Sequence, residues 1–432
     1  MAITFRIAKS WTSTWSTSSS LPSFFFQRNP SVFTPSACLS SATVKKQRKN
    51  SGKRKASELA ALSRRDKEKR RTRSDKDYAV EKIDATAHED HVPVMCAEII
   101  DVFSSLSLRS FVDCTLGAAG HSSAILKSHD ELKYFLGIDV DPIAMEKGRT
   151  LVDNIASSSQ RESSLEVYTK LRNFKHIKSI LGECNENLLQ SGVDAILMDL
   201  GMSSMQLEIS ERGFSVLSDG PLDMRMDPEA TLKAKDILNS WPDEELGRIL
   251  REYGEEPNWR SLQKRILQER LYGGLHYTTD LVDLIRDVTP GRCEGRHGWI
   301  KTSIRVFQSL RIAVNDELNT LEKSLHHCFE CLAPEGRLAV ISFHSLEDRI
   351  VKRAFLSIIN SGKDEDEGRY ENGKMDRKHS DEQWIKQMVH GKNGIILTRR
   401  PITPSSIEEK LNRRSRSAKL RVIQKCSSFP KT

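Results

Sequence analysis

The stretch Phe111-Val-Asp-Cys-Thr-Leu-Gly-Ala-Ala-Gly-His121 decides the fold class of this chain. Its first five residues suit a short buried strand, and the turn that follows consists largely of small residues. The apolar spacing from Ser122 to Leu126 then predicts a helix. A strand that passes through glycines directly into a helix is typical of the first unit of an α/β domain with a parallel sheet.

A second strand is expected over residues 134–138, and it ends in Asp139. Pro142 favours the start of another helix soon after, because proline is tolerated in the first helical turn. Gly117 and Gly120 let the backbone approach a ligand closely, and the helix that follows them offers free N–H groups. Asp139 comes 22 residues after Gly117, where a carboxylate can accept hydrogen bonds from ribose hydroxyls. This order predicts a nucleoside-cofactor site.

Two further strands are expected at residues 193–198 and 336–343. Asp199 follows the first of them, at the edge of the sheet where ligands bind in α/β proteins, although an aspartate there can also simply cap a turn. His344 follows the second strand and could contact substrate or fill a strand–helix corner; the residues leave both open. The sequence Ser-Leu-Glu-Asp at 345–348 is read as a capping box that opens a helix.

Sequence motifs narrow the choice among possible cofactors. A Tyr-x-x-x-Lys runs from Tyr78 to Lys82, ahead of the first strand, where it cannot serve a nicotinamide site on the sheet. No Gly-x-x-x-x-Gly-Lys-Ser/Thr is present, which makes a phosphate-cradling nucleotidase a poor fit. S-adenosylmethionine fits better, because its ribose suits Asp139 and its sulfonium cation tolerates an acidic pocket.

The charge of the chain is divided unevenly along its 432 residues. The net charge is +8, but residues 1–76 alone carry 18 basic and four acidic residues, so the remaining 356 carry a net −6. Any nucleic-acid affinity of the main body must therefore come from local patches. No apolar run approaches the roughly 20 residues that span a bilayer, so no membrane association is expected. The eight cysteines have irregular spacing and are expected to be mostly reduced thiols.

Residues 1–44 are rich in Ser and Thr and contain no acidic residue, as in an organelle transit peptide. The high serine content favours the chloroplast stroma, with the mitochondrion as the alternative; a plain disordered tail is a further reading. Residues 45–87 are expected to be a basic, disordered linker. Its basic run could touch RNA phosphates or act as a nuclear signal, or it could be a solvated connection only.

Over about residues 91–425 the sequence resembles the MraW/RsmH family of small-subunit ribosomal RNA cytosine-N4 methyltransferases. The resemblance rests on a series of long sequence motifs that follow one another in the same order. These motifs are His91-Val-Pro-Val, the glycine-rich turn with His121, Gly137-Ile-Asp-Val-Asp-Pro142, Asp199-Leu-Gly-Met-Ser-Ser-Met-Gln-Leu207, Arg212-Gly-Phe-Ser215, Gly220-Pro-Leu-Asp-Met-Arg-Met-Asp227, Tyr253-Gly-Glu-Glu256, Phe307-Gln-Ser-Leu-Arg311, Val314-Asn-Asp-Glu-Leu318, Ser342-Phe-His-Ser-Leu-Glu-Asp348 and Arg414-Ser-Arg-Ser-Ala-Lys-Leu-Arg421.

The resemblance implies an α/β fold: a Rossmann-like, class I methyltransferase doubly wound sheet with an inserted helical domain. The implied parts are the first methyltransferase segment (88–208), a helical RNA-recognition domain (209–310), a second methyltransferase segment (311–425) with a polar loop (361–393), and a tail (426–432). The implied S-adenosylmethionine contacts are Ala119, Gly120, His121, Asp139, Phe174, Asp199 and Gln206. Asp199 is also the expected catalytic residue, and no metal site is expected.

The resemblance further implies methylation of N4 of a cytidine in the decoding region of an organellar, 16S-type rRNA, either naked or in the assembled small subunit. A homodimer is one open possibility for the oligomeric state. The alternatives from other classes are a non-catalytic RNA-binding ribosome assembly factor, a nicotinamide oxidoreductase and a DNA methylase. The family usually has glycine at position 119, so Ala119 is expected to narrow the backbone approach there and to be strained if φ is positive.

Four helices are expected in the inserted segment, at residues 234–239, 244–253, 259–271 and 281–288. Their mixture of arginine, lysine and aromatic residues suits RNA, although an ordinary solvated subdomain has the same composition.

Past this segment, an apolar stripe from Leu310 to Leu332 predicts one amphipathic helix stopped by Pro334, with Cys328 and Cys331 packed near the stripe. An alternating strand at 418–423 is expected to complete the sheet edge and to expose arginine and lysine to RNA.

Overall fold

The computed structural model describes residues 72–76, 93–158, 164–289, 298–361, 382, 384, 385 and 387–427. The expected transit peptide, most of the expected linker and most of the polar loop 361–393 lie outside the described residues. Every described residue belongs to one compact unit, residues 65–432. Within the expected linker, Ser74 donates its backbone N–H to the carbonyl of Thr403 at 2.8 Å, and Arg73 pairs with Glu409.

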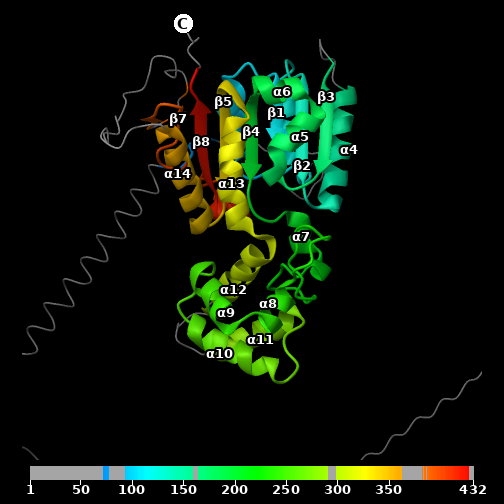
Figure 1. Cartoon of the computed structure of the whole chain (residues 1–432), viewed down its shortest axis with the longest axis vertical. Helices are drawn as coiled ribbons and strands as arrows, with labels where there is room; N and C mark the ends of the chain where they lie inside the picture. Colours follow the sequence, from blue (N-terminus) through cyan, green and yellow to red (C-terminus); the bar gives the residue numbers. More distant parts are fainter. Residues whose placement is uncertain are drawn as a thin grey trace, which may run out of the picture. The chain divides into compact units, whose positions relative to one another are not determined.

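An eight-stranded sheet in the order β3-β2-β1-β4-β5-β8-β7-β6 forms the body of the unit (Figure 1). Its strands are β1 Ser110–Asp113, β2 Tyr134–Asp139, β3 Glu166–Leu171, β4 Val193–Asp199, β5 Leu332–Ser342, β6 Val389–His390, β7 Gly394–Ile396 and β8 Lys419–Lys425. The first five strands are parallel, and β8 pairs antiparallel to β5. The strand order reverses between β1 and β4, which is the switch point where α/β sheets bind ligands.

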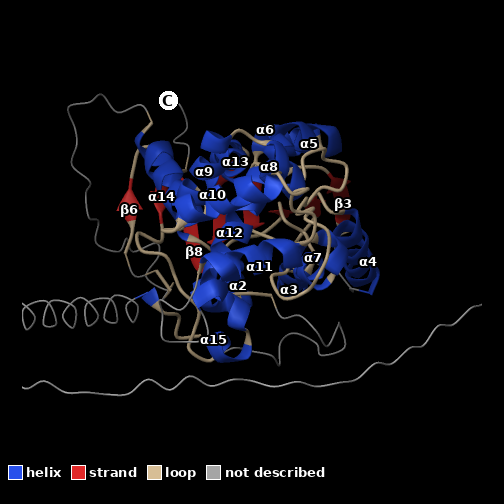
Figure 2. Ribbon diagram, turned by 90° about the horizontal axis from the view of Figure 1, so that it is seen from below, coloured by secondary structure: helices blue, strands red, loops and turns tan. Residues whose placement is uncertain are grey.

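Helices cover both faces of this sheet (Figure 2). One face carries α2 Cys96–Ser104, α3 Gly120–Ser128 and α4 Pro142–Ser158, and the other carries α5 Ile177–Cys184, α6 Glu186–Ser191, α13 Glu317–Glu330 and α14 Ser345–Asn360. Successive strand residues alternate between the two cores: Phe111 is buried on the α2 side, and Val112 is buried on the α13 side. This alternation follows from the period of two in a β-strand.

A separate helical bundle follows β4 in the chain. The chain leaves β4 through α7 Ser204–Glu208 and a 3-10 turn, Ser210–Arg212, and then forms α8 Ala234–Ser240, α9 Asp243–Glu252, α10 Trp259–Arg270, α11 Thr278–Val288 and α12 Gly298–Asn315. These helices share a hydrophobic core that includes Leu246, Ile266 and Ile285. The expected class, a doubly wound α/β sheet with an inserted helical domain, is confirmed.

The single helix expected from the stripe at 310–332 is wrong. Asp316 has a left-handed backbone (φ 47°) and separates α12 from α13, and α13 ends at Glu330. Leu332 begins β5, and Pro334 lies inside this strand rather than ending a helix. Proline is tolerated there because the pairing of β5 with β4 shifts register just after Leu332. Cys328 and Cys331 are buried in the sheet core, as expected.

The expected capping box at 345–348 is displaced by one residue. His344 is the N-cap of α14: its Nδ1 accepts the backbone N–H of Glu347 at 3.3 Å, and the Glu347 carboxylate accepts the N–H of His344 at 3.2 Å. Asp348 instead accepts hydrogen bonds from Arg421 at 2.6 Å and Lys419 at 3.0 Å.

The expectation that the last strand forms the sheet edge is also wrong. Hydrogen bonds join β8 to β5 on one side and to β7 on the other. Arg421 is only 5% exposed, because the ion pair with Asp348 holds it against α14. This arginine is therefore not offered to RNA.

None of the described helices is long and apolar enough to cross a membrane.

Candidate functional site

A cavity of about 1050 Å³ opens at the carboxyl ends of β1, β2 and β4. It lies at the switch point of the sheet and extends to the first residues of the helical domain. Six of the seven predicted contact residues line it: Gly120, His121, Asp139, Phe174, Asp199 and Gln206. The sequence therefore predicted residues that are far apart in the chain and that the fold brings to one place.

Ala119 is the predicted contact that does not line this cavity. Its backbone is left-handed (φ 60°, ψ 28°), so the expected strain is present. Its methyl group, however, is fully buried in the core on the α2 side of the sheet. The expectation that this methyl narrows the approach to a ligand is therefore wrong, because the methyl points into the core and not into the cavity.

The glycine-rich turn is held by a carboxylate. Gly117, with φ +53°, donates its N–H to Oδ2 of Asp139 at 2.7 Å. Gly120 needs to be glycine for a packing reason, since a Cβ there would lie 2.6 Å from Cγ of Pro93. Asp139 also accepts the N–H of Asp141 at 2.9 Å, and burial raises its pKa to about 6.

Asp141 joins the sheet to the helical domain, and the sequence analysis missed it. Its Oδ2 accepts Nε2–H of Gln206 at 2.9 Å and Nη1–H of Arg212 at 2.8 Å. Arg212 also donates to the backbone carbonyls of Arg225 and Met226, both at 2.9 Å. One buried carboxylate thus fixes Gln206 in the cavity wall and anchors the start of the helical domain.

Asp199 lies at the tip of β4 with one oxygen unused. Its backbone N–H donates to Oγ1 of Thr115 at 2.7 Å, which holds the strand tip beside the glycine-rich turn. Oδ2 lies 3.7 Å from Nδ1 of His121, whereas Oδ1 is buried and has no hydrogen-bond partner in the part of the chain that the structure describes. Burial raises the pKa of Asp199 to about 6. Buried polar atoms are nearly always hydrogen-bonded, so this unpaired oxygen distinguishes Asp199 from the other carboxylates of the cavity.

Residues 88–426 match the MraW methylase family. The chain belongs to this family. It is 41% identical over 340 residues to the ribosomal RNA small subunit methyltransferase H of Heliobacterium mobile, covering 78% of this chain and 98% of that protein. The protein of the same name from Brevibacillus brevis is 39% identical over 339 residues, again covering 78% and 98%. Among solved structures, an O-methyltransferase from Thermotoga maritima matches with a TM-score of 0.31 and 8% identity, covering 81% of this chain and 73% of that one.

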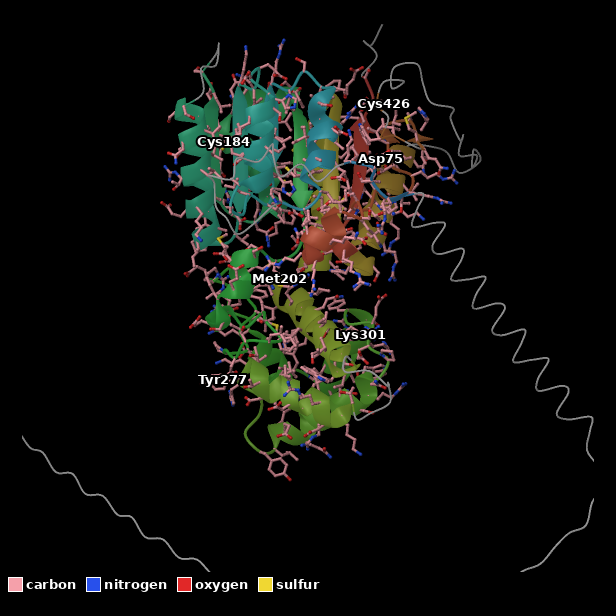
Figure 3. All side chains as sticks on the ribbon, turned by 180° about the vertical axis from the view of Figure 1, so that it is seen from behind. Asp75, Cys184, Met202, Tyr277, Lys301 and Cys426 are labelled. Atoms are coloured by element: carbon pink, nitrogen blue, oxygen red, sulfur yellow. The ribbon has the colours of Figure 1, made fainter. Side chains whose placement is uncertain are left out.

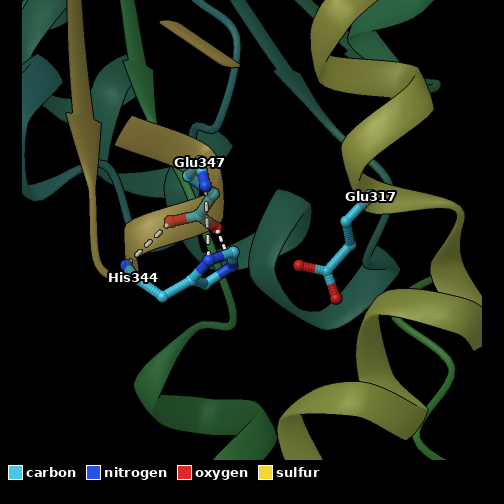
Figure 4. Close-up of side chains that lie close together, drawn as sticks. All are labelled: Glu317, His344 and Glu347. Atoms are coloured by element: carbon cyan, nitrogen blue, oxygen red, sulfur yellow. Dashed lines mark hydrogen bonds and ion pairs between the residues drawn. The ribbon is translucent and has the colours of Figure 1, made fainter. Parts of the chain in front are cut away.

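This member of the MraW methylase family has a charged network around Arg311 at the wall of the cavity; Figure 4 shows three neighbours of that arginine, Glu317, His344 and Glu347. Arg311 donates from Nε and Nη2 to the two oxygens of Glu317, at 2.8 and 2.9 Å. Glu347 lies 4.0 Å from Nη2 of Arg311, and its Oε1 lies 2.9 Å from Nε2 of His344. Ligand atoms of Glu317, His344 and Glu347 lie within 4.8 Å of one another, but Arg311 already occupies both oxygens of Glu317. The network is thus an arginine clamped by two carboxylates.

The sequence analysis gave no role to Arg311 or Phe343, although both stand in words that carry the family resemblance. Both line the cavity. Their places in the chain could have indicated a role at the site. Phe343 follows the tip of β5, and Arg311 lies near the end of α12, where the helical domain returns to the sheet. Met202, two residues past the leucine that follows Asp199, lies at the same junction (Figure 3).

Phe174 has two kinds of neighbour. It begins a short 3-10 turn, Phe174–His176, after β3. It is partly buried against the core on the α13 side and also lines the cavity. The resemblance predicted a ligand contact, and the structure also gives Phe174 a packing role; its position allows both.

Proposed function

We propose that this chain is an S-adenosylmethionine-dependent methyltransferase that methylates N4 of a cytidine in the decoding region of a small-subunit, 16S-type ribosomal RNA. The observation that carries the proposal is the buried, unpartnered Oδ1 of Asp199, at the tip of a central strand and in the cavity that also contains Asp139. Membership of the MraW methylase family supports methyl transfer, and the names of the relatives support small-subunit ribosomal RNA as the substrate.

The residues of the cavity fit a nucleoside cofactor. Asp139 stands at the tip of β2 beside the glycine-rich turn, where ribose hydroxyls are bound in such sheets. Phe174 offers a ring edge or face for adenine, and Gly120, at the start of α3, offers backbone N–H groups. Bound S-adenosylmethionine supplies an electrophilic methyl group on a sulfonium sulfur.

In this proposal, Asp199 is the residue that makes the amine nitrogen of the target base nucleophilic. The lone pair of a cytosine amine is delocalised into the ring, so the nitrogen becomes nucleophilic only as it pyramidalises. An acceptor on its N–H stabilises the positive charge that then develops. We assign this to Oδ1 of Asp199, which also takes up the proton that the nitrogen loses. The remaining acceleration comes from holding the reactants in line, and the base must leave its stack to reach the cavity.

The helical domain provides the RNA-binding surface in this proposal. Its arginines are interleaved with aromatic residues, and some of these rings are already covered: the guanidinium of Arg260 lies 4.4 Å from the centroid of the Trp259 ring, and that of Arg286 lies 4.2 Å from that of Trp299. Tyr272, by contrast, is 83% exposed in the loop after α10. Because arginines lie over these rings, we expect this surface to contact RNA phosphates through the arginines. The exposed ring of Tyr272 can stack on an unstacked base.

The proposed location is the chloroplast stroma, with the mitochondrion as the alternative. The support is the serine-rich, acid-free composition of residues 1–44. The test is to follow the full chain fused to a fluorescent protein in plant cells. Plastid import supports the proposal, whereas a diffuse cytosolic or nuclear signal contradicts it.

The proposed reaction is tested by incubating the full chain with methyl-labelled S-adenosylmethionine and unmethylated small ribosomal subunits, in parallel with naked rRNA. Label in a single cytidine supports the proposal, and the better substrate shows whether the assembled subunit is required. Tight binding to the subunit without label would favour an RNA-binding assembly factor instead.

A further inference from the structure

Gly201 lies between two side chains that the proposed reaction has not used. A Cβ placed on Gly201 would lie 3.8 Å from Cδ2 of Phe343 and 3.9 Å from Nη1 of Arg311. All three residues line the cavity, and Gly201 follows Asp199 by two positions. The bare backbone of Gly201, with φ +100°, therefore leaves a space beside an aromatic ring and a guanidinium, in the same cavity that Asp199 lines.

One nitrogen of Arg311, Nη1, lies next to this space, and the guanidinium is held in a fixed position. The side chain is only 9% exposed, and Glu317 engages its Nε and Nη2. Within the described residues, Nη1 has no hydrogen-bond partner. Two carboxylates, Glu317 and Glu347, keep the guanidinium charged and fix its plane. The result is a hydrogen-bond donor whose direction is set before any ligand arrives.

Phe343 adds a flat surface. It directly follows β5, and its ring packs against the core on the α2 side while it also borders the cavity. A ring fixed on one side by the core offers its other surface to a base at little entropic cost.

We infer that Asp199, Phe343 and Arg311 form the seat of the target base, in which Phe343 stacks on the ring and Nη1 of Arg311 donates to the ring carbonyl next to the glycosidic bond. This rests on the proposed function and adds the residues that select the base. Cytosine carries an amine, a ring acceptor and a carbonyl along one edge, and this order matches a carboxylate followed by an arginine.

Uracil and adenine match this seat poorly. Uracil would place a carbonyl oxygen against the carboxylate of Asp199, and adenine has an amine but no carbonyl for Arg311. The seat therefore distinguishes cytosine from uracil and adenine by the fixed order of a hydrogen-bond acceptor and a hydrogen-bond donor.

The test uses the full chain loaded with S-adenosylhomocysteine and three probes: cytidine, uridine and adenosine 5′-monophosphates, with binding followed by NMR. The wild type is expected to prefer the cytidine nucleotide by about tenfold. Arg311→Lys keeps the charge beside Glu317 but loses the fixed fork, so this preference is expected to fall to near unity. Phe343→Leu is expected to weaken the binding of all three probes alike, because stacking does not read the base edge.

The matched control is Arg353→Lys, on the exposed face of α14. It is expected to behave as the wild type, and all variants are expected to bind S-adenosylhomocysteine within twofold of it. With small subunits as substrate, Arg311→Lys is expected to raise KM more than it lowers kcat. An unchanged preference and KM in Arg311→Lys, or equal binding of the three probes by the wild type, would overturn the inference. If instead the wild type selects the cytidine nucleotide through Arg311 but never methylates subunits, the seat stands and the proposed function fails.

Discussion

His121 and Asp199 face each other across the cavity, with Nδ1 of His121 3.7 Å from Oδ2 of Asp199. The backbone carbonyl of Val94 accepts a hydrogen bond from Nε2 of His121 at 2.8 Å, so the other ring nitrogen, Nδ1, is the one that faces the carboxylate. Oδ1 of Asp199 is buried and has no hydrogen-bond partner among the residues that the structure describes. The two residues together can hold one proton, which is what an amine loses when it is methylated.

The first prediction concerns Asp199 itself. Asp199→Ala is expected to abolish turnover while the chain stays folded, because it removes the proposed proton acceptor. The measurement is label incorporation into small subunits, with circular dichroism as the check of folding. Methylation within about tenfold of the wild type would contradict the assigned role.

A companion variant, Asp199→Asn, separates function from stability. The folded-state pKa of about 6 is above the ordinary value of 3.8, so protonation favours the folded state, and ionisation above pH 6 opposes it. Asp199→Asn is therefore expected to raise Tm at pH 8 and to leave it nearly unchanged at pH 4, while activity is lost at both. A lower Tm at pH 8 would show that the carboxylate stabilises the fold instead.

The second prediction is the pH dependence of kcat. Asp199 can take up the proton of the amine only as a carboxylate, and its pKa is about 6. At saturating cofactor, kcat is expected to rise from pH 5 to pH 7 and then to level off. The cofactor must be saturating because the pKa of Asp139 is also about 6. The affinity for the cofactor is therefore expected to fall as the pH is lowered from 7 to 5. A kcat that is flat from pH 5 to pH 8 would exclude Asp199 as the acceptor.

The third prediction is that Asp139→Ala weakens cofactor binding by at least about tenfold. The substitution removes the proposed ribose acceptor and also frees the N–H groups of Gly117 and Asp141. Calorimetry with S-adenosylmethionine measures the affinity, and Glu131→Gln, at a distance from the cavity, is the control. Unchanged affinity in Asp139→Ala would remove Asp139 from the site.

The fourth prediction concerns Ala119→Gly. The substitution relieves a left-handed backbone strain of about 1–2 kcal/mol but removes a buried methyl group and adds chain entropy to the unfolded state. The net change in the free energy of unfolding is expected to stay within about 1 kcal/mol. Cofactor affinity is expected to be unchanged, because the methyl faces the core. A tenfold gain in affinity would mean that the methyl does obstruct the ligand.

The fifth prediction tests Phe174 as an adenine contact. Phe174→Leu keeps apolar packing against the α13-side core but loses the ring, so cofactor affinity is expected to fall several-fold with little change in Tm. Phe174→Tyr keeps the ring and is expected to bind normally. Equal affinity in the leucine variant would leave Phe174 as a core residue only.

The sequence predicted the parts of the fold that depend on local patterns. β1, the glycine-rich turn and β2 were placed within one or two residues, because buried strands and glycine turns have strong local signals. The apolar stripe at 310–332 misled because a helix and a following buried strand are both apolar. The break depends on the left-handed backbone of Asp316, which no local pattern indicates.

Ion pairs between residues far apart in the chain also limited what the sequence could predict about the site. Arg421 looked like a surface cation in the sequence, yet it is buried because Asp348, 73 positions away, neutralises it. Arg311 could not be assigned for the same reason, since its orientation depends on Glu317 and Glu347 from two other helices. Local spacing places residues on elements, but partners from distant elements decide which charges are exposed to a ligand.

The central claim is that the cavity beside Asp199 methylates a cytosine amine in small-subunit rRNA, and mapping the methyl group tests it most directly. Unmethylated small subunits are incubated with the full chain and labelled S-adenosylmethionine, and the labelled nucleoside is identified by digestion and mass spectrometry. The account predicts N4-methylcytidine at a single position, which is lost with Asp199→Ala. Label on a ribose hydroxyl, on a ring carbon or on another base would contradict it.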